Sequence, residues 1–173
     1  ALMQAEAAEK SGALQAALDL YNRALGLKPN EKIPAEKIVA LQQQIDAQQA
    51  LAKKDAEYNS LIQQADEQFE SKSYAEAAQT YQQALAIKPN EKYPNDRLSE
   101  TKTILNNLSV LAEQERNYNA RIAEAEQLFS EEKYEPSIVK FKEASKIKPD
   151  ETLPQTRIQL AEAKLAEANA TKL

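Results

Sequence analysis

The chain has 173 residues and a formal net charge of −5, from 22 Lys and Arg against 27 Asp and Glu. A mildly acidic chain of this kind is not typical of a nucleic-acid-binding protein, which normally concentrates basic residues on one face. The chain has no His and no Cys, which excludes disulfides, thiol nucleophiles, Ser-His-Asp triads and zinc sites built on those residues. No apolar run approaches the roughly 20 residues that span a bilayer. We therefore expect no cofactor, no metal and no membrane-spanning segment.

The first elements are two short helices joined by a turn at Gly12, where a left-handed backbone is easiest for glycine. Tyr21 and Ala24 lie on the apolar face of the second helix, which should end at Lys28 because the residue before Pro29 avoids the helical region. The second proline, Pro34, suits the first position of the next helix. The N-terminal segment is therefore predicted to form a helical hairpin, and the chain is expected to begin part-way through a repeating unit.

A long helix should follow, since no Gly or Pro interrupts residues 35–73. We expect about 37 residues, or roughly 55 Å at 1.5 Å per residue. Its first half carries Ile38, Leu41 and Ile45 at spacings of three and four residues, and its second half carries a different apolar face that starts the next hairpin. A break near 53–56, where apolar residues thin out, stays open, as does one near 113–117 in the corresponding helix.

A short helix from Tyr74 then completes the second hairpin. Tyr81 and Ala84 continue its apolar stripe, and Ser73 with Glu76 matches the capping-box pattern. The same elements return in residues 95–154, where Pro136 falls in the first turn of the last short helix and has no hydrogen bond to lose there.

The strongest signal is a repeat with an offset of 60 residues. The segment LKPNEKIP, residues 27–34, recurs as IKPNEKYP at 87–94 and as IKPDETLP at 147–154. We divide the chain into repeat unit 1 (1–53), unit 2 (54–113) and unit 3 (114–173). Exact spacing without insertion or deletion indicates that each unit is one structural module.

The hairpins resemble the tetratricopeptide repeat, a 34-residue helix-turn-helix module used as a protein-interaction scaffold. The resemblance in the second unit rests on Ala65, Phe69, Tyr74, Ala77, Tyr81, Ala84, Leu85 and Pro89. It implies protein or peptide partners and a partner-binding face on the first helix of each hairpin. The residues at the family's groove positions here are Asn59, Asp66, Glu70, Asn119 and Glu126.

These observations predict an all-α fold, in which tandem helical hairpins, tetratricopeptide-like, are linked by long helices into an elongated helical repeat rod. The first half of each long helix should pack back on the preceding hairpin as a three-helix bundle. The stripe through Leu98, Leu105 and Leu108 is expected to be core of the second bundle.

We expect a non-enzymatic interaction scaffold or spacer within a larger protein, as a monomer or with weak self-association. Two alternatives stay open. One is a self-associating segment of coiled-coil type. The other is a carboxylate-based enzyme using the acidic loops at Asn90-Glu91 and Asp150-Glu151. Similar arrays in multidomain bacterial envelope proteins suggest the periplasm or cell surface by resemblance.

The rod prediction has a direct test in small-angle scattering of the isolated chain. Each unit should advance by roughly 30–35 Å, the length of the long helix less that of the short return helix, so the maximum dimension should be about 100 Å. A maximum dimension near that of a globule of this mass would contradict the prediction, as would strands in the circular dichroism spectrum.

Overall fold

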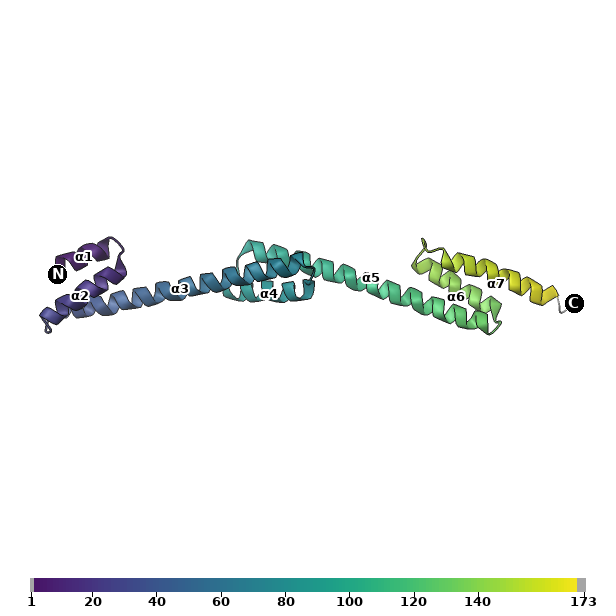
Figure 1. Ribbon diagram of the computed structural model, residues 1–173, viewed down its shortest axis with the longest axis horizontal. Coiled ribbons are helices and arrows are strands. Elements are labelled where there is room, and N and C mark those ends of the chain that lie inside the picture. The colour runs from purple at the N-terminus through teal and green to yellow at the C-terminus, as the bar shows by residue number, and fades with distance from the viewer. Residues whose placement is uncertain (1, 171–173) are drawn as a thin grey trace. The chain divides into compact units, whose positions relative to one another are not determined.

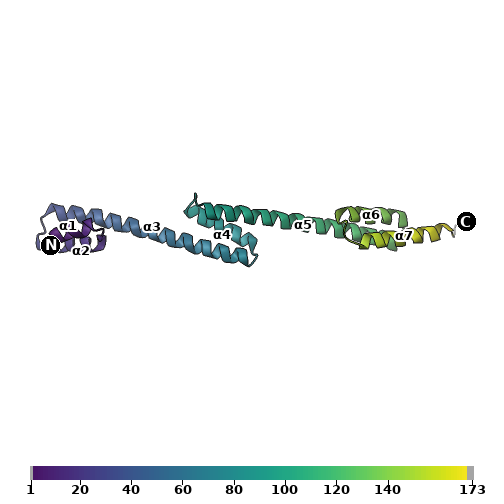
Figure 2. The ribbon, with the colours of Figure 1, turned by 90° about the horizontal axis from the view of Figure 1, so that it is seen from above.

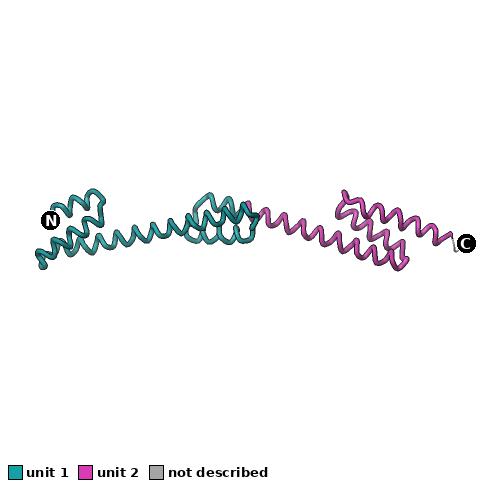
Figure 3. Tube along the Cα trace, in the orientation of Figure 1, with its two compact units in different colours: residues 1–99 teal, residues 100–173 magenta. Residues whose placement is uncertain are grey.

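The computed structural model describes residues 2–170, which form seven α-helices and no strand (Figure 1). The prediction of an all-α fold built from helical hairpins and long helices is confirmed. The chain divides into two compact units, residues 1–99 and residues 100–173 (Figure 3). The boundary between them falls inside one helix, α5 (Lys92–Ser130). Each unit is described below by itself.

The first bundle of residues 1–99 contains α1 (Leu2–Lys10), α2 (Leu14–Leu27) and the start of α3 (Lys32–Glu70). In Figures 1 and 2, α2 lies beside the start of α3, and the two helices are in contact. Tyr21 of α2 is buried against Leu41 and Ile45 of α3, with the small side chains of Ala5 and Ala17 beside them. The first half of the long helix therefore packs back on the preceding hairpin, as predicted.

The second bundle of the same unit joins the end of α3, α4 (Tyr74–Ile87) and the first residues of α5. Ala65, Ala77 and Tyr81 form its fully buried centre, and Leu98 of α5 packs against them. Removal of these apolar side chains from water provides the main driving force for the bundle, at about 25 cal/mol per Å² of apolar surface.

Residues 100–173 contain the rest of α5, α6 (Tyr134–Ile147) and α7 (Leu153–Ala170). Ala125 of α5 is fully buried, as are Phe141 and Ala144 of α6. α6 and α7 are in contact, and α7 extends beyond α6 toward the C-terminus (Figure 1). This unit therefore repeats the helix–short helix–helix arrangement of the bundle formed by α3, α4 and α5.

Burial follows the 60-residue offset of the sequence. Six sets of equivalent positions are buried throughout: Ala5, Ala65 and Ala125; Ala17, Ala77 and Ser137; Tyr21, Tyr81 and Phe141; Ala24, Ala84 and Ala144; Pro34, Pro94 and Pro154; Leu41, Thr101 and Ala161. The periodicity of the sequence is therefore a periodicity of the core. The predicted repeat-unit boundaries, 53/54 and 113/114, fall inside α3 and α5, and the division into three units stays a prediction.

Both long helices are continuous and have 39 residues, two more than expected. Residues 53–56 and 113–117 are helical, so neither of the suggested breaks occurs. The helices begin earlier than predicted. The prolines, which were expected at the first helical position, are third in α3 and α5 (Pro34 and Pro94) and second in α7 (Pro154). Proline is tolerated anywhere in the first turn, where backbone N–H groups have no partner within the helix.

The capping box predicted at Ser73 and Glu76 is wrong. Ser73 is the N-cap of α4, but its side chain makes no capping hydrogen bond. Its backbone, with φ −78° and ψ 62°, departs from the extended conformation of capping residues. Ala13 and Lys133 hold nearly the same angles at the equivalent positions. The turn between the paired helices therefore sets this backbone geometry, whatever side chain stands there.

Those turns share one left-handed residue. Gly12 has φ 77°, as the sequence predicted, and Lys72 and Glu132 take the same place with φ 65° and 58°. In the first turn, the Gly12 and Ala13 N–H groups donate to the carbonyls of Glu9 and Ala8, both at 3.0 Å. These two hydrogen bonds satisfy carbonyl groups at the C-terminal end of α1, as in other helices that end at a left-handed glycine. At two of the three turns a residue with a Cβ adopts this strained conformation.

The expected core stripe on α5 ends earlier than predicted. Leu108 is 49% exposed, so its assignment to the bundle core is wrong. Leu111, three residues further on, is exposed as well. Gln48, the position in α3 that is equivalent to Leu108, is also exposed. The return helices have only 14 residues, which is about 21 Å of helix, so they are too short to cover the middle of a 39-residue helix.

Replacing the left-handed residues with glycine should stabilise the fold. A left-handed conformation costs an L-residue about 1–2 kcal/mol, and a glycine at the same place avoids this cost. About half of the benefit is lost again, because glycine loses more backbone entropy on folding than other residues do. We therefore expect Lys72→Gly and Glu132→Gly each to raise the free energy of unfolding by about 0.5–1 kcal/mol, measured by urea denaturation.

Two controls accompany these variants. Lys72→Ala removes the same side chain but keeps the Cβ, so it should give no comparable gain. Gly12→Ala introduces the strain into the first turn and should lower stability. A glycine variant that is less stable than its alanine counterpart at residue 72 would contradict the strain argument.

Candidate partner-binding surface

The carboxylate of Asp66, one of the predicted face residues, lies at the centre of a polar cluster. Its Oδ1 accepts hydrogen bonds from the hydroxyls of Tyr81, at 2.5 Å, and Tyr93, at 2.8 Å. The guanidinium of Arg97 lies 4.0 Å from the same oxygen and is centred 3.8 Å over the ring of Phe69. This cluster ties α3 to α4 and α5, so Asp66 contributes to the bundle as well as to its surface.

The Tyr81 hydroxyl titrates above its ordinary range. Burial raises its pKa first, and the hydrogen bond to Asp66 raises it further, because ionisation would place a phenolate beside a carboxylate. Tyr21, its counterpart in the first bundle, donates to Glu9 at 2.9 Å. Burial and this hydrogen bond raise the pKa of Tyr21 to about 12. Both hydroxyls are therefore neutral donors at physiological pH.

Each bundle has an ion pair at this place. Glu126, the predicted face residue of the third hairpin, lies 2.7 Å from Arg157 Nε of α7. The guanidinium of Arg157 is 5.8 Å from the ring of Phe129. In the first bundle Glu9, not Glu6, supplies the carboxylate and pairs with Lys37 at 2.7 Å. The basic partner always comes from the helix that follows the hairpin, at the equivalent positions 37, 97 and 157.

The other predicted face residues are exposed. Asn59 and Glu70 lie on α3 with their side chains open to solvent, at either end of the stretch that contains Asp66. Asn119 is exposed on α5 and donates to Glu115 at 3.1 Å. The five residues thus fall into two kinds: paired carboxylates at Asp66 and Glu126, and open polar groups at Asn59, Glu70 and Asn119. Their role in binding a partner stays a prediction.

A second recurring contact surrounds the lysine of each Lys-Pro turn. Lys88 lies 2.8 Å from Asp55 and 4.5 Å from the ring centre of Tyr58. We call this arrangement of lysine, carboxylate and tyrosine the lysine clasp. In residues 100–173 it is made by Lys148, which pairs with Glu115 and lies 5.0 Å from the ring centre of Tyr118. The clasp links the C-terminal end of the short helix to the long helix. The lysine cation is stabilised there by the partial negative charge of the helix C-terminus and by the face of the tyrosine ring.

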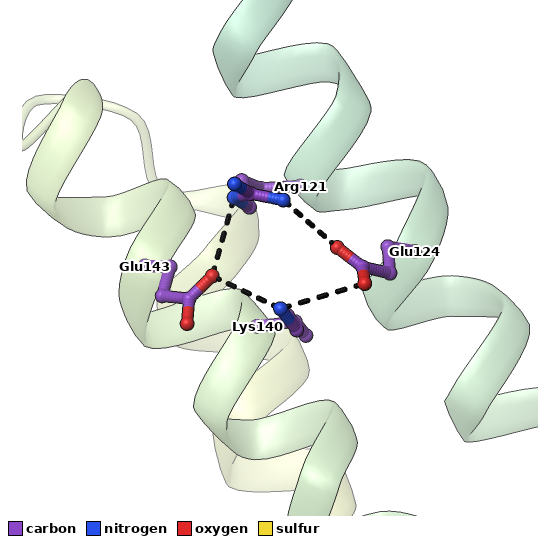
Figure 4. A network of polar contacts seen from close by, with 4 residues as sticks. All are labelled: Arg121, Glu124, Lys140 and Glu143. Carbon is purple, nitrogen blue, oxygen red and sulfur yellow. Dashed lines mark hydrogen bonds and ion pairs between the residues drawn. The ribbon is translucent and has the colours of Figure 1, made fainter.

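A closed ring of four charges joins α5 to α6 in the second unit (Figure 4). Arg121 contacts Glu124 at 3.0 Å and Glu143 at 3.2 Å, and Lys140 contacts the same carboxylates at 3.4 and 3.3 Å. The equivalent positions of the preceding hairpin hold Leu61, Gln64, Thr80 and Gln83. The ring therefore gives one hairpin a charged surface that the other lacks, and complementary charges of this kind contribute to the specificity of association.

An open groove of about 540 Å³ lies beside this ring, between α5 and the end of α6. Its lining mixes two apolar side chains with four polar or charged ones: Val110 and Ile147 with Glu113, Gln114, Asn117 and Arg121. Gln114 donates to the backbone carbonyl of Ile147 at 3.0 Å. The groove is a shallow surface feature and not an enclosed substrate pocket.

The acidic loops at Asn90-Glu91 and Asp150-Glu151 follow the short helices α4 and α6. Asn90, Glu91 and Asp150 are exposed, and Glu151 lies 3.9 Å from Lys148. Among residues 2–170, no group of three or more acidic side chains is placed to hold a metal ion. Across the same residues, none of the helices has an apolar stretch of membrane-spanning length.

Sequence reasoning identified the acidic positions but missed their partners. Lys37, Arg97 and Arg157 were not singled out, although a basic residue recurs there at the 60-residue offset. The same holds for the lysine clasp, whose signal is a carboxylate three residues before a tyrosine at 55–58 and again at 115–118. Charges repeated in every unit, and not only apolar residues, could have revealed both contacts.

Comparison with known proteins adds little beyond the helices themselves. No protein-family model matches the chain, and no curated protein matches it. Among solved structures, the chain is similar to the P58(IPK) TPR domain, with 20% sequence identity over 96% of this chain and 55% of that one. The TM-score is 0.29, which is too low to show that the two chains share a fold. This chain spans about half the length of that solved chain.

The lysine clasp should make the free energy of unfolding depend on pH in the acidic range. The hydrogen bond from Lys148 lowers the pKa of Glu115 below its ordinary value. A carboxyl with a lowered folded-state pKa stabilises the fold above its unfolded-state value, near pH 4.3, and this contribution is lost as the pH falls through the folded-state value. We expect Glu115→Gln to flatten the loss of stability between about pH 5 and pH 3, measured by thermal unfolding at fixed ionic strength.

The matched control is Glu113→Gln. Glu113 is an exposed glutamate two residues away, and no ion pair to it is found among the described residues. This substitution should leave the pH profile close to that of the unaltered chain. Equal profiles for Glu115→Gln and the unaltered chain would show that the clasp contributes nothing to the acid response.

Proposed function

We propose that this chain is a non-enzymatic helical repeat segment that presents surfaces to protein partners and spaces the elements on either side of them. The observation that supports this most is the recurrence of the same buried positions at the 60-residue offset, in all three hairpins. Repeated modules that contact mainly their neighbours provide extended surfaces, and such surfaces serve protein binding more often than chemistry.

The surface chemistry is consistent with this role. The hairpins share a core but differ outside it, since the ring of Arg121, Glu124, Lys140 and Glu143 has no charged counterpart in the preceding hairpin. Electrostatic complementarity selects partners and guides their approach. A shared core with individual surfaces lets each hairpin contribute a different contact.

Within this proposal, each hairpin has its own binding face. On α3 the face contains Asn59 and Glu70 beside Asp66, and on α5 it contains Asn119 beside Glu126. The tetratricopeptide resemblance supports the choice of the first hairpin helix. The ion pairs of Asp66 and Glu126 restrict their use, because a partner that takes either carboxylate must compete with Arg97 or Arg157. The exposed residues are therefore the better targets for a test.

Adding positive charge to α3 tests the face. We expect the double variant Asn59→Lys and Glu70→Lys to reduce captured partner at least tenfold in affinity purification from the source cells, while circular dichroism stays unchanged. Glu70 is the last residue of α3, where a cation is favourable, so the variant should fold.

The control is Glu57→Lys, which reverses one acidic charge, as Glu70→Lys does, at an exposed site on another side of α3. It should leave partner capture intact. Equal capture by the double variant and by the control would contradict the assignment of this face. Equal loss in both would indicate that net charge matters and not the face.

A further inference from the structure

Each of the two long helices contains a stretch that is exposed along its whole length. All residues of 46–51 in α3 and of 106–111 in α5 are exposed, and the two stretches are equivalent by the 60-residue offset. Packing therefore contributes little to either one, and each keeps its helical form mainly through the intrinsic preference of its residues. Since exposure is the same in both, the difference between them lies in their sequences.

The two sequences differ in how well they favour a helix. The stretch in α3 reads DAQQAL, and the stretch in α5 reads NNLSVL. Alanine, the strongest helix former, occurs twice in the first sequence and is absent from the second. Asn and Ser side chains compete for backbone hydrogen bonds outside a helix, and the β-branched Val loses rotamer freedom within one. The stretch in α5 is therefore the weaker helix.

The apolar side chains of the weaker stretch add little to its stability. Leu108, Val110 and Leu111 are 49%, 56% and 60% exposed, so a core holds none of them. Leu108 and Leu111 lie three residues apart, on one helix face, and such a pair supports an exposed helix only slightly. The deficit in helix preference is therefore not made good by packing.

We propose that residues 106–111 open locally while the helical segments on both sides stay folded, which makes this stretch a joint within α5. Thr101 on one side is fully buried, and Tyr118 and Ala125 on the other side are buried as well. Segments with few buried contacts open at a lower cost in free energy than the packed segments around them. The equivalent stretch of α3 is a stronger helix, so α3 is a stiff spacer and α5 yields at a defined place.

This inference goes beyond the proposed function, because it concerns the stability of one helix and holds whether or not the chain binds a partner. Its test measures opening of the backbone, whereas the test of the binding face measures captured partner. Either result can fail without the other.

Amide hydrogen exchange of the whole chain, resolved by residue, measures the opening. The summed helix preferences predict exchange on the order of fivefold faster at 106–111 than at 46–51, after correction for the intrinsic rate of each amide. Exchange at 106–111 should also respond little to low concentrations of urea, because a local opening exposes little surface. Equal protection of the two stretches would overturn the proposal, and so would a urea dependence at 106–111 equal to that of Tyr118.

An exchange of residues between the helices separates the effect of sequence from that of position. The α5 variant carries Asn107→Ala, Ser109→Gln and Val110→Ala, which copies residues 47, 49 and 50 of α3. All three positions are exposed, so the bundles should fold as before. Exchange at 106–111 should fall to the level of 46–51. Unchanged exchange there would contradict the proposal, because these side chains would not control the opening.

The reverse variant places the weaker sequence in α3. It carries Ala47→Asn, Gln49→Ser and Ala50→Val, and it should raise exchange at 46–51 on the order of fivefold. Exchange at 106–111 should stay as it is in the unaltered chain. A reverse variant that exchanges no faster at 46–51 would also count against the proposal.

Limited proteolysis with thermolysin, which cleaves before apolar residues, gives a second readout. Cleavage of a folded chain follows the population of the opened form when opening and closing are fast. We expect the first cut before Leu108 or Leu111. The α5 variant keeps both leucines, so its cleavage there should slow on the order of fivefold through the loss of opening alone. Equal cleavage at these leucines in the variant and in the unaltered chain would overturn the proposal.

Discussion

Close contact between alanine-rich helix faces is the constraint on which each bundle depends. Ala5, Ala65 and Ala125 are fully buried, and so are Ala17, Ala77 and the equivalent Ser137. Side chains this small let two helices approach closely, and they leave one large space per bundle. Tyr21, Tyr81 or Phe141 fills that space. A larger residue at an alanine position would separate the helices, because interiors are packed too densely to absorb added volume.

Polar contacts are then arranged around this small core. Where the central residue is a tyrosine, its hydroxyl reaches a carboxylate of the first hairpin helix, as in Tyr81 with Asp66. Where it is Phe141, no hydroxyl is present, and Glu126 pairs with Arg157 instead. The basic residue of the following helix is common to both arrangements. The third helix of each bundle is therefore held by apolar packing at its base and by an ion pair at the level of the central ring.

The sequence was sufficient to predict the helices, the long linking helices and the buried residues of the hairpins, because these depend on spacing along one chain segment. It did not predict where the core stripe of α5 ends, since Leu108 is exposed. Local geometry at the turns was harder to predict. Glycine marked the left-handed position at residue 12, but Lys72 and Glu132 adopt it without a glycine, since the packed hairpin requires it. The partners of the candidate face residues were not predicted either. Arg97 reaches Asp66 across helices, and such a contact depends on side-chain reach and on the separation of the helices.

The middle of α3 has a consequence of its own. Residues 46–57 are all exposed except Asp55, which is partly buried, so no tertiary contact with a core fixes this stretch. It is rich in Ala, Gln and Lys, which sustain a helix by intrinsic preference. Because this stretch is part of one continuous helix, its length fixes how the two bundles of residues 1–99 are rotated about the helix axis relative to each other. A single inserted residue there would turn one bundle by about 100° relative to the other while moving it only about 1.5 Å. The direction in which each surface points is therefore encoded in the number of residues, almost independently of their identity.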